Sequence, residues 1–165
     1  MSTALTEPTL PGRDLTGVRP IADGLFTWPS DEPHLVGSRC DGCGNVSFPA
    51  QASCPRCTGT DVSERLLARD GVLWTWTVQG FRPKSPPYAG PAEFEPYPVG
   101  YIELPGEVKV ESRLVDVDVG DLTIGMPMEL VIVPFTLEGG DRALTFAFRP
   151  RRLSGSESGE DADRE

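Results

Sequence analysis

Polar and apolar positions alternate along the second half of the chain, which is typical of β-strands. The clearest run is residues 71–78, Gly-Val-Leu-Trp-Thr-Trp-Thr-Val, which is rich in β-branched and aromatic residues. Because successive side chains on a strand point to opposite faces, this run is predicted to present two sets of side chains. One set is Val72, Trp74, Trp76 and Val78, and the other is Leu73, Thr75 and Thr77.

Four more strand-like runs follow, at residues 97–104, 107–117, 128–137 and 143–148. The turn dipeptide Pro105-Gly106 separates the first two and predicts a hairpin, and Gly139-Gly140 marks a turn between the last two. Five strands with no helical pattern between them predict a mainly β protein. Residues 66–152 are expected to form a five-stranded OB-fold barrel, with a small sandwich as the alternative.

Four cysteines stand in two pairs ahead of these strands. They read Cys40-Asp-Gly-Cys43 and, ten residues later, Cys54-Pro-Arg-Cys57. A spacing of two residues lets both sulfurs of a pair reach one ion from a tight turn, and zinc prefers four such thiolates in a tetrahedron. Residues 37–65 are therefore predicted to form a rubredoxin-like zinc ribbon. Four protein ligands leave no open position for water or substrate, so the zinc is expected to be structural.

Two other chemistries use similar cysteines. A rubredoxin-type iron centre has the same four-thiolate geometry, whereas a dithiol redox pair needs only one Cys-x-x-Cys motif. The single histidine, His34, precedes the cysteines and is not needed as a ligand, so it is interpreted as an ordinary surface residue.

The two ends of the chain differ in character from the middle. Residues 1–36 form an N-terminal extension whose apolar residues are interrupted by Pro29 and Pro33, which predicts a short helix or a turn. Residues 153–165 are almost devoid of apolar side chains and rich in acidic ones. Such a segment buries too little surface to offset its chain entropy, so a disordered acidic tail is expected there.

A long proline-rich segment separates the first two barrel strands, from residue 81 to residue 98. Long loops in compact domains are commonly functional, and prolines lower the entropy lost when such a loop docks. Four of its residues are candidates for contacts with coenzyme A or with a partner: Phe81, Arg82, Lys84 and Tyr88. The alternative is a loop that only closes over the mouth of the barrel.

Charge and length narrow the classes of function. The 165 residues carry a formal net charge of −10, which repels a phosphate backbone, so nucleic acid is a poor candidate partner. No stretch approaches the roughly 20 apolar residues that cross a bilayer, so no membrane role is expected. Without a signal pattern at the N-terminus, a cytoplasmic location is expected, where paired cysteines serve as metal ligands rather than disulfides.

The order of these features resembles an acyl-CoA-associated family that joins a rubredoxin-like zinc ribbon to an OB-fold. The resemblance runs from about residue 35 to residue 150. Its motifs are Cys40-Asp-Gly-Cys43-Gly, Pro49, Cys54-Pro-Arg-Cys57, Gly71-Val-Leu-Trp-Thr-Trp-Thr-Val78, Pro98-Val-Gly-Tyr-Ile-Glu-Leu104, Leu122-Thr-Ile-Gly-Met-Pro-Met-Glu-Leu130 and Thr145-Phe-Ala-Phe-Arg-Pro150.

The resemblance implies an accessory subunit of a thiolase-fold enzyme that acts on acyl-CoA thioesters. Relatives in actinobacteria pair with lipid-transfer-protein-type thiolases and support retro-aldol cleavage of steroid side chains, which releases propionyl-CoA. Since thiolase folds are usually dimers, a two-plus-two heterotetramer is expected by analogy. The partner supplies the catalytic residues in this family.

The residues themselves support a non-catalytic role. If all four cysteines bind metal, no cysteine nucleophile remains, and one histidine leaves little room for a Ser-His-Asp arrangement. Two other classes stay open at this point. A zinc-ribbon OB-fold could bind single-stranded nucleic acid by stacking bases on Trp74, Trp76 and Phe81, and a free-standing enzyme would turn over substrate alone.

Overall fold

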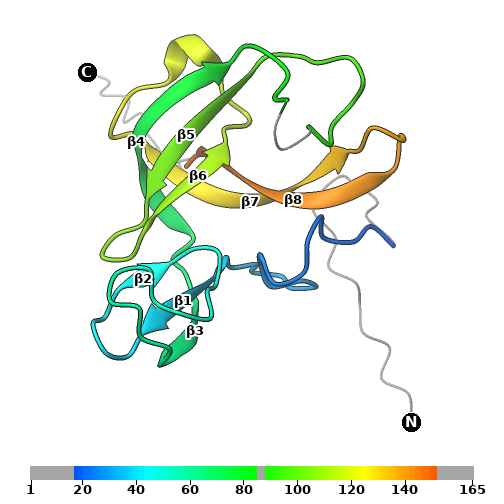
Figure 1. Cartoon of the computed structure of the whole chain (residues 1–165). Helices are drawn as coiled ribbons and strands as arrows, with labels where there is room; N and C mark the ends of the chain where they lie inside the picture. Colours follow the sequence, from blue (N-terminus) through cyan, green and yellow to red (C-terminus); the bar gives the residue numbers. More distant parts are fainter. Residues whose placement is uncertain (1–16, 85–87, 152–165) are drawn as a thin grey trace, which may run out of the picture.

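The structure is a computed structural model that describes residues 17–84 and 88–151. The predictions for residues 1–16 and for the acidic tail at 153–165 lie outside the described residues. Two bodies lie one above the other in Figure 1, a small three-stranded unit below a five-stranded barrel. Within the described residues, no helix is long and apolar enough to cross a membrane.

The small unit contains the cysteines and has the strand order β2-β1-β3. Its strands are β1 (Val36–Cys40), β2 (Val46–Ser47) and β3 (Val62–Leu66), all antiparallel. Gly37 on β1 lies so close to β2 that a Cβ atom would stand 2.6 Å from the carbonyl oxygen of Ser47. This position therefore needs glycine for the two strands to approach.

The larger unit has the strand order β6-β5-β4-β7-β8. Its elements are β4 (Asp70–Gln79), β5 (Tyr97–Glu103), β6 (Lys109–Arg113), the 3-10 turn η1 (Val119–Asp121), β7 (Pro127–Thr136) and β8 (Arg142–Pro150). A parallel bridge joins Leu114, just after β6, to Phe148 on β8, and the N–H of Val115 donates to the Phe148 carbonyl at 2.9 Å. This link nearly closes the sheet into the predicted mainly β, five-stranded OB-fold barrel.

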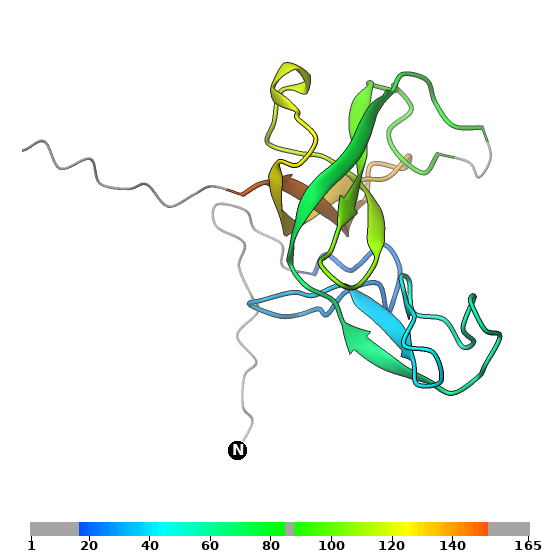
Figure 2. The ribbon, with the colours of Figure 1, turned by 90° about the vertical axis from the view of Figure 1, so that its left-hand side faces the viewer.

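The predicted hairpin at Pro105-Gly106 is confirmed. Strands β5 and β6 pair antiparallel on either side of it, and the φ angle of Gly106 is 69°, a left-handed value that favours glycine. Figure 2 shows that the long loop after β4 and the segment around η1 extend from opposite sides of the barrel.

The predicted alternation along residues 71–78 is wrong in one respect. The pairing of β4 with β5 shifts between Leu73 and Thr75, which is a β-bulge at Trp74. Leu73 is fully buried, Trp74 is 50% exposed, and Trp76 packs against the core. Because a bulge adds one residue to one strand, Trp74 and Trp76 do not share a face in the way that strict alternation predicts.

The N-terminal extension forms turns and short bridges rather than a helix over its described part, residues 17–36. The N–H of Ile21 donates to the Leu144 carbonyl and the N–H of Leu144 donates to the Arg19 carbonyl, both at 2.8 Å. The extension thus borders β8. It also folds back on itself, because Phe26 and Leu35 form an antiparallel bridge. Pro20, Pro29 and Pro33 lack the N–H that a helix needs, which favours the turn over the helix.

One core runs through both units. Phe26, Leu35 and Leu67 lie in the same buried cluster as Leu73 and Ile102 of the barrel. The ribbon also places the ring of Phe48 edge-on to Phe146 of β8, with the ring centroids 5.4 Å apart. The ribbon is therefore packed onto the barrel.

Candidate functional site

The four cysteines lie on two tight turns that have the same construction. In the first, the N–H of Gly44 donates to the Cys40 carbonyl at 2.8 Å, and in the second the N–H of Thr58 donates to the Cys54 carbonyl at 2.9 Å. Both closing residues have left-handed backbones, with φ angles of 72° at Gly44 and 61° at Thr58. Each turn therefore presents its two sulfurs to the same side.

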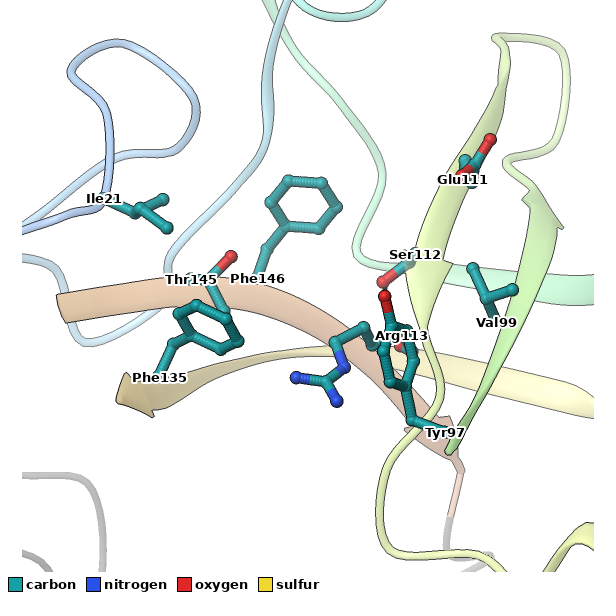
Figure 3. Close-up of a pocket in the computed structure, with 9 residues that line it drawn as sticks. All are labelled: Ile21, Tyr97, Val99, Glu111, Ser112, Arg113, Phe135, Thr145 and Phe146. Atoms are coloured by element: carbon teal, nitrogen blue, oxygen red, sulfur yellow. Dashed lines mark hydrogen bonds between the residues drawn. The ribbon is translucent and has the colours of Figure 1, made fainter. Parts of the chain in front are cut away.

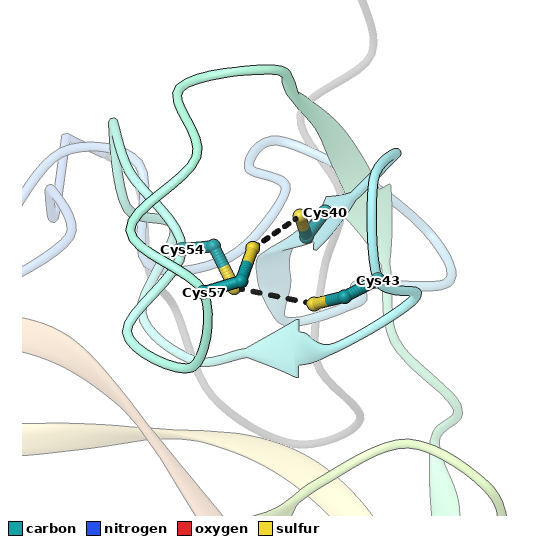
Figure 4. Close-up of side chains that lie close together, drawn as sticks. All are labelled: Cys40, Cys43, Cys54 and Cys57. Atoms are coloured by element: carbon teal, nitrogen blue, oxygen red, sulfur yellow. Dashed lines mark hydrogen bonds between the residues drawn. The ribbon is translucent and has the colours of Figure 1, made fainter.

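The two turns face each other and bring the four sulfurs together (Figure 4). All four Sγ atoms lie within 4.8 Å of one another. The distances Cys40–Cys57 and Cys43–Cys54 are both 3.6 Å. A tetrahedron with Zn–S bonds of about 2.3 Å has S–S edges of about 3.8 Å, so the cluster has the size that one zinc ion requires.

The protein environment prepares part of this cluster for metal. Hydrogen bonds from the backbone N–H groups of Cys57 and Arg56 lower the pKa of the Cys54 thiol to about 6. At Cys43 the backbone N–H of Asn45 favours the thiolate, but loss of solvent and the three neighbouring sulfurs raise its pKa to about 12. Four thiols this close do not all ionise without a cation between them, so the donor set fits a bound zinc ion.

Four cysteine ligands fill the tetrahedron, which makes this zinc a structural one. His34 is not part of the cluster. Its Nδ1 lies 2.8 Å from the carbonyl oxygen of Leu67, and its own carbonyl accepts the N–H of Thr27 at 2.9 Å. The histidine thus ties the extension to the residues that follow β3.

Arg82 organises the long loop after β4. Its Nη1 donates to the carbonyl oxygens of Pro91 and Ala92 at 3.0 and 2.8 Å, and its guanidinium lies 5.4 Å from the centroid of the Tyr88 ring. Its Nη2 also forms an ion pair with Glu138 at 3.4 Å, in the turn between β7 and β8. The guanidinium therefore holds this loop against the β7–β8 turn.

Tyr88 belongs to an aromatic cluster at the base of the same loop. Its ring stacks on Tyr97 at 6.5 Å and meets Phe94 and Phe135 edge-on at 5.5 and 6.2 Å. These rings come from the loop, from β5 and from β7. The two loops that border this cluster are the ones with which OB-folds commonly bind ligands.

Phe81 and Lys84 have no such supporting role. Phe81 is 73% exposed, and Lys84 is exposed with no ion pair to any carboxylate in the described part of the chain. The four residues predicted from the sequence thus separate into two pairs. Arg82 and Tyr88 shape the loop, and Phe81 and Lys84 are available to a partner.

Sequence reasoning missed three residues that matter to this arrangement: Glu107, Arg113 and Phe135. Glu107 is a buried carboxylate that bonds to Arg65 of β3. Arg113 lies against the rings of Tyr97 and Phe135. In the sequence, Arg113 is one of several charges that alternate with apolar residues, and its partners come from other strands, so no local signal distinguishes it.

A four-cysteine zinc ribbon followed by an OB-fold barrel defines a class of two-part proteins. Residues 28–63 match the family described as "ChsH2, rubredoxin-like zinc ribbon domain", and residues 64–133 match "ChsH2, C-terminal OB-fold domain". The chain belongs to this ChsH2-type family of zinc-ribbon OB-fold proteins, and the resemblance drawn from its sequence motifs is confirmed.

Relatives include proteins of archaea and bacteria. A "DUF35 domain-containing scaffold protein" of Methanocaldococcus jannaschii is 32% identical over 119 residues, which cover 70% of this chain and 79% of the relative. A protein of the same description from Methanothermobacter thermautotrophicus is 31% identical over 117 residues, covering 70% and 84%. "Benzoylsuccinyl-CoA thiolase subunit BbsA" of Thauera aromatica is 33% identical over 93 residues, covering 54% and 59%.

A solved structure shows the same architecture. The chain is similar to a chain of the "Ltp2-ChsH2(DUF35) aldolase", with a TM-score of 0.53 and 26% sequence identity. The match covers 71% of this chain and 84% of that one.

Proposed function

We propose that this chain is a non-catalytic accessory subunit that binds a thiolase-fold, lipid-transfer-protein-like enzyme and supports its chemistry on an acyl-CoA thioester. The proposal rests on the observation that the cysteines and the histidine of this chain already have structural roles. All four cysteines of the sequence converge on the zinc centre, and its single histidine contacts the Leu67 carbonyl. No thiol nucleophile is left over, and the one imidazole makes a contact between the extension and the residues after β3, so we infer that a partner supplies the reacting groups.

The names of the relatives support this reading. One is a subunit of a thiolase, two are scaffold proteins, and the similar solved structure is an aldolase of two named components. A subunit, two scaffold proteins and a component of a two-part enzyme are all consistent with an accessory role. Fold alone does not assign a reaction, so the particular chemistry is a finer proposal.

The finer proposal is a retro-aldol cleavage of a steroid side-chain CoA thioester that releases propionyl-CoA. The assembly is a cytoplasmic two-plus-two heterotetramer, and acyl-CoA passes near the loop after β4. Phe81 and Lys84 support this placement because both are exposed at the start of that loop. A large exposed aromatic ring favours burial against a partner, and an unpaired ammonium favours a phosphate or carboxylate.

The charge pattern argues against nucleic acid. Cations of the described barrel are largely engaged by carboxylates, as in the pairs Lys109–Glu103 at 3.0 Å and Arg149–Glu129 at 2.7 Å. Lys109 also lies 4.8 Å over the ring of Trp74, which was a candidate for stacking a base. A paired cation releases few counterions from a phosphate backbone, so it contributes little to nucleic-acid affinity.

Co-expression with a lipid-transfer-protein-like thiolase, followed by size-exclusion chromatography and a steroid acyl-CoA cleavage assay, tests the proposal. We expect one peak that contains both proteins and cleavage only by the pair. If this chain elutes alone and the enzyme is fully active without it, the accessory role is overturned.

Two matched variants locate the contact within the complex. Phe81→Ser removes a ring that is 73% exposed, and Ile124→Ser removes a side chain that is 72% exposed in the segment between η1 and β7. We expect Phe81→Ser to weaken complex formation and Ile124→Ser to leave it unchanged. Equal effects would show that the loop after β4 is not the contact.

A further inference from the structure

A groove opens on the barrel between the β5–β6 hairpin and the β7–β8 hairpin. It has a volume of about 280 Å³, and Figure 3 shows the side chains around it. The lining residues are Ile21, Tyr97, Val99, Glu111, Ser112, Arg113, Phe135, Thr145 and Phe146. The groove lies beside the Leu114–Phe148 bridge that joins them, since Arg113 directly precedes Leu114. Pockets for whole small ligands start at about 300 Å³, so this one suits a small molecule.

Arg113 is the cation of this groove. Its Cζ lies 3.7 Å from the centroid of the Tyr97 ring and 5.6 Å from that of Phe135. In Figure 3 the guanidinium projects from β6 into the space between these rings. No carboxylate in the described part of the chain forms an ion pair with it, in contrast to Arg149 and Arg65. Stacking leaves the N–H edge of a guanidinium open to an anion.

The rest of the lining is mainly apolar. Ile21, Val99, Phe135 and Phe146 provide hydrocarbon surface, and the Thr145 hydroxyl is a second polar group beside them. The hydroxyl of Ser112 is already used, because it donates to the Arg113 carbonyl at 3.0 Å. Apolar walls with one cation and a few hydroxyls, here those of Thr145 and Tyr97, are the usual composition of a site for a small amphipathic anion.

Glu111 limits the charge of such an anion. Its Oε2 accepts the Tyr101 hydroxyl at 2.8 Å, and it lies at the same groove as Arg113. A carboxylate that lines the same groove repels a dianion such as phosphate more strongly than it repels a single negative charge.

We propose that this groove binds a small monocarboxylate with an apolar skeleton. The guanidinium of Arg113 receives the carboxylate, with two N–H groups in the fork geometry that arginine favours. The hydrocarbon part of the ligand packs on Val99, Phe135 and Phe146, where its apolar surface is removed from water. This binding belongs to the isolated chain and does not depend on the proposed enzyme partner.

The competing explanation is that Arg113 only clamps Tyr97 to Phe135 by cation–π contact. The two explanations differ in what they predict for neutral ligands. If Arg113 is only a clamp, the groove binds a carboxylate and its neutral amide with equal affinity. If Arg113 binds anions, the groove binds the carboxylate more tightly than the amide.

The test uses the full zinc-loaded chain, with benzoate and hexanoate as probes and benzamide as the neutral isostere of benzoate. Titration at neutral pH is followed by amide chemical-shift changes and by calorimetry. We expect shifts at the groove residues with benzoate and hexanoate. We expect benzamide to bind about tenfold more weakly, which is the effect of losing one charge-assisted pair.

Variants complete the test. Arg113→Gln is expected to reduce benzoate affinity about tenfold and to bring it to the level of benzamide. Arg113→Lys keeps the positive charge but lacks the two parallel N–H groups of arginine. Its affinity for benzoate is expected to lie between those of the unmodified chain and Arg113→Gln. Arg142→Gln removes an exposed arginine at the start of β8 and is the matched control, with affinity unchanged.

Three outcomes overturn the proposal. The first is equal affinity for benzoate and benzamide in the unmodified chain, a comparison that needs no variant to fold. The second is undiminished benzoate binding by Arg113→Gln with a native amide spectrum. The third is the absence of any shift at the groove with either carboxylate at millimolar concentration.

Discussion

Arg65 and Glu107 join the zinc ribbon to the barrel through an ion pair with two hydrogen bonds. Oε1 of Glu107 accepts Nε and Nη2 of Arg65 at 2.9 and 2.7 Å, and Oε2 accepts the N–H of Ala68 at 2.7 Å. The glutamate side chain is only 7% exposed. Arg65 lies on β3 and Glu107 lies in the turn between β5 and β6, so one carboxylate of the barrel adds a polar contact to the apolar core that the two units share.

Replacing Glu107 is expected to weaken the fold. Glu107→Ala leaves the Ala68 N–H without its acceptor and Arg65 without its partner, and we expect a loss of about 2 kcal/mol in the free energy of unfolding. Urea unfolding measures this loss. Glu64→Ala, which removes an exposed carboxylate on the same strand as Arg65, is the control and should change stability little. Equal losses in both variants would contradict the role given to Glu107.

The zinc centre is expected to depend on every cysteine. Cys54→Ser removes a buried ligand, and we expect the variant to lose its zinc and the order of the ribbon, because few large apolar residues hold that segment. Metal analysis by mass spectrometry and amide exchange measure the two effects. Ser53→Ala, at the exposed neighbouring position, should keep one zinc. A full equivalent of zinc in Cys54→Ser would contradict the four-thiolate site.

Close approach of strands β4 and β5 gives a third prediction. A Cβ atom at Gly71 would lie 2.6 Å from the Glu103 carbonyl oxygen and 2.8 Å from Ile102. We expect Gly71→Ala to reduce the free energy of unfolding by about 1–3 kcal/mol, since the strands must separate to admit the methyl group. Thermal unfolding measures it. Gly139→Ala is the matched control because nothing lies within 4 Å of its Cβ position. An unchanged melting temperature for Gly71→Ala would contradict the tight pairing.

Arg82 and Lys84 are expected to act differently although both are cations of one loop. Arg82→Ala removes the donors to Pro91 and Ala92, so we expect faster proteolytic cleavage between residues 80 and 96. Lys84→Ala should leave the cleavage rate of the free chain unchanged and should weaken acyl-CoA turnover only in the reconstituted complex. Limited proteolysis with mass spectrometry and kinetics of the complex separate the two roles. Equal cleavage rates would contradict the role of Arg82 in holding the loop.

Local sequence patterns predicted well where the strands lie. They predicted less well which side chains of a strand face the core. The hairpin at Pro105-Gly106 follows from two adjacent residues with strong turn preferences, and the structure has it. The bulge at Trp74 has no such local signal. The bulge arises where β4 pairs with β5 in the curved sheet of the barrel. The exposure of Trp74 therefore depends on the neighbouring strand and not on the alternation of side chains along β4.

The sequence by itself determined the zinc ribbon and the order of the barrel strands. Cysteine spacing and side-chain alternation act between residues close in the chain, and the chemistry of thiolate and zinc leaves few other arrangements for two Cys-x-x-Cys pairs. The tertiary structure alone decided how the zinc ribbon joins the barrel and which side chains of the barrel come together at its surface. Glu107 meets Arg65 across 42 residues, and Arg113 meets Tyr97 and Phe135 from separate strands. Such contacts depend on strand register and barrel curvature, which are properties of the whole sheet.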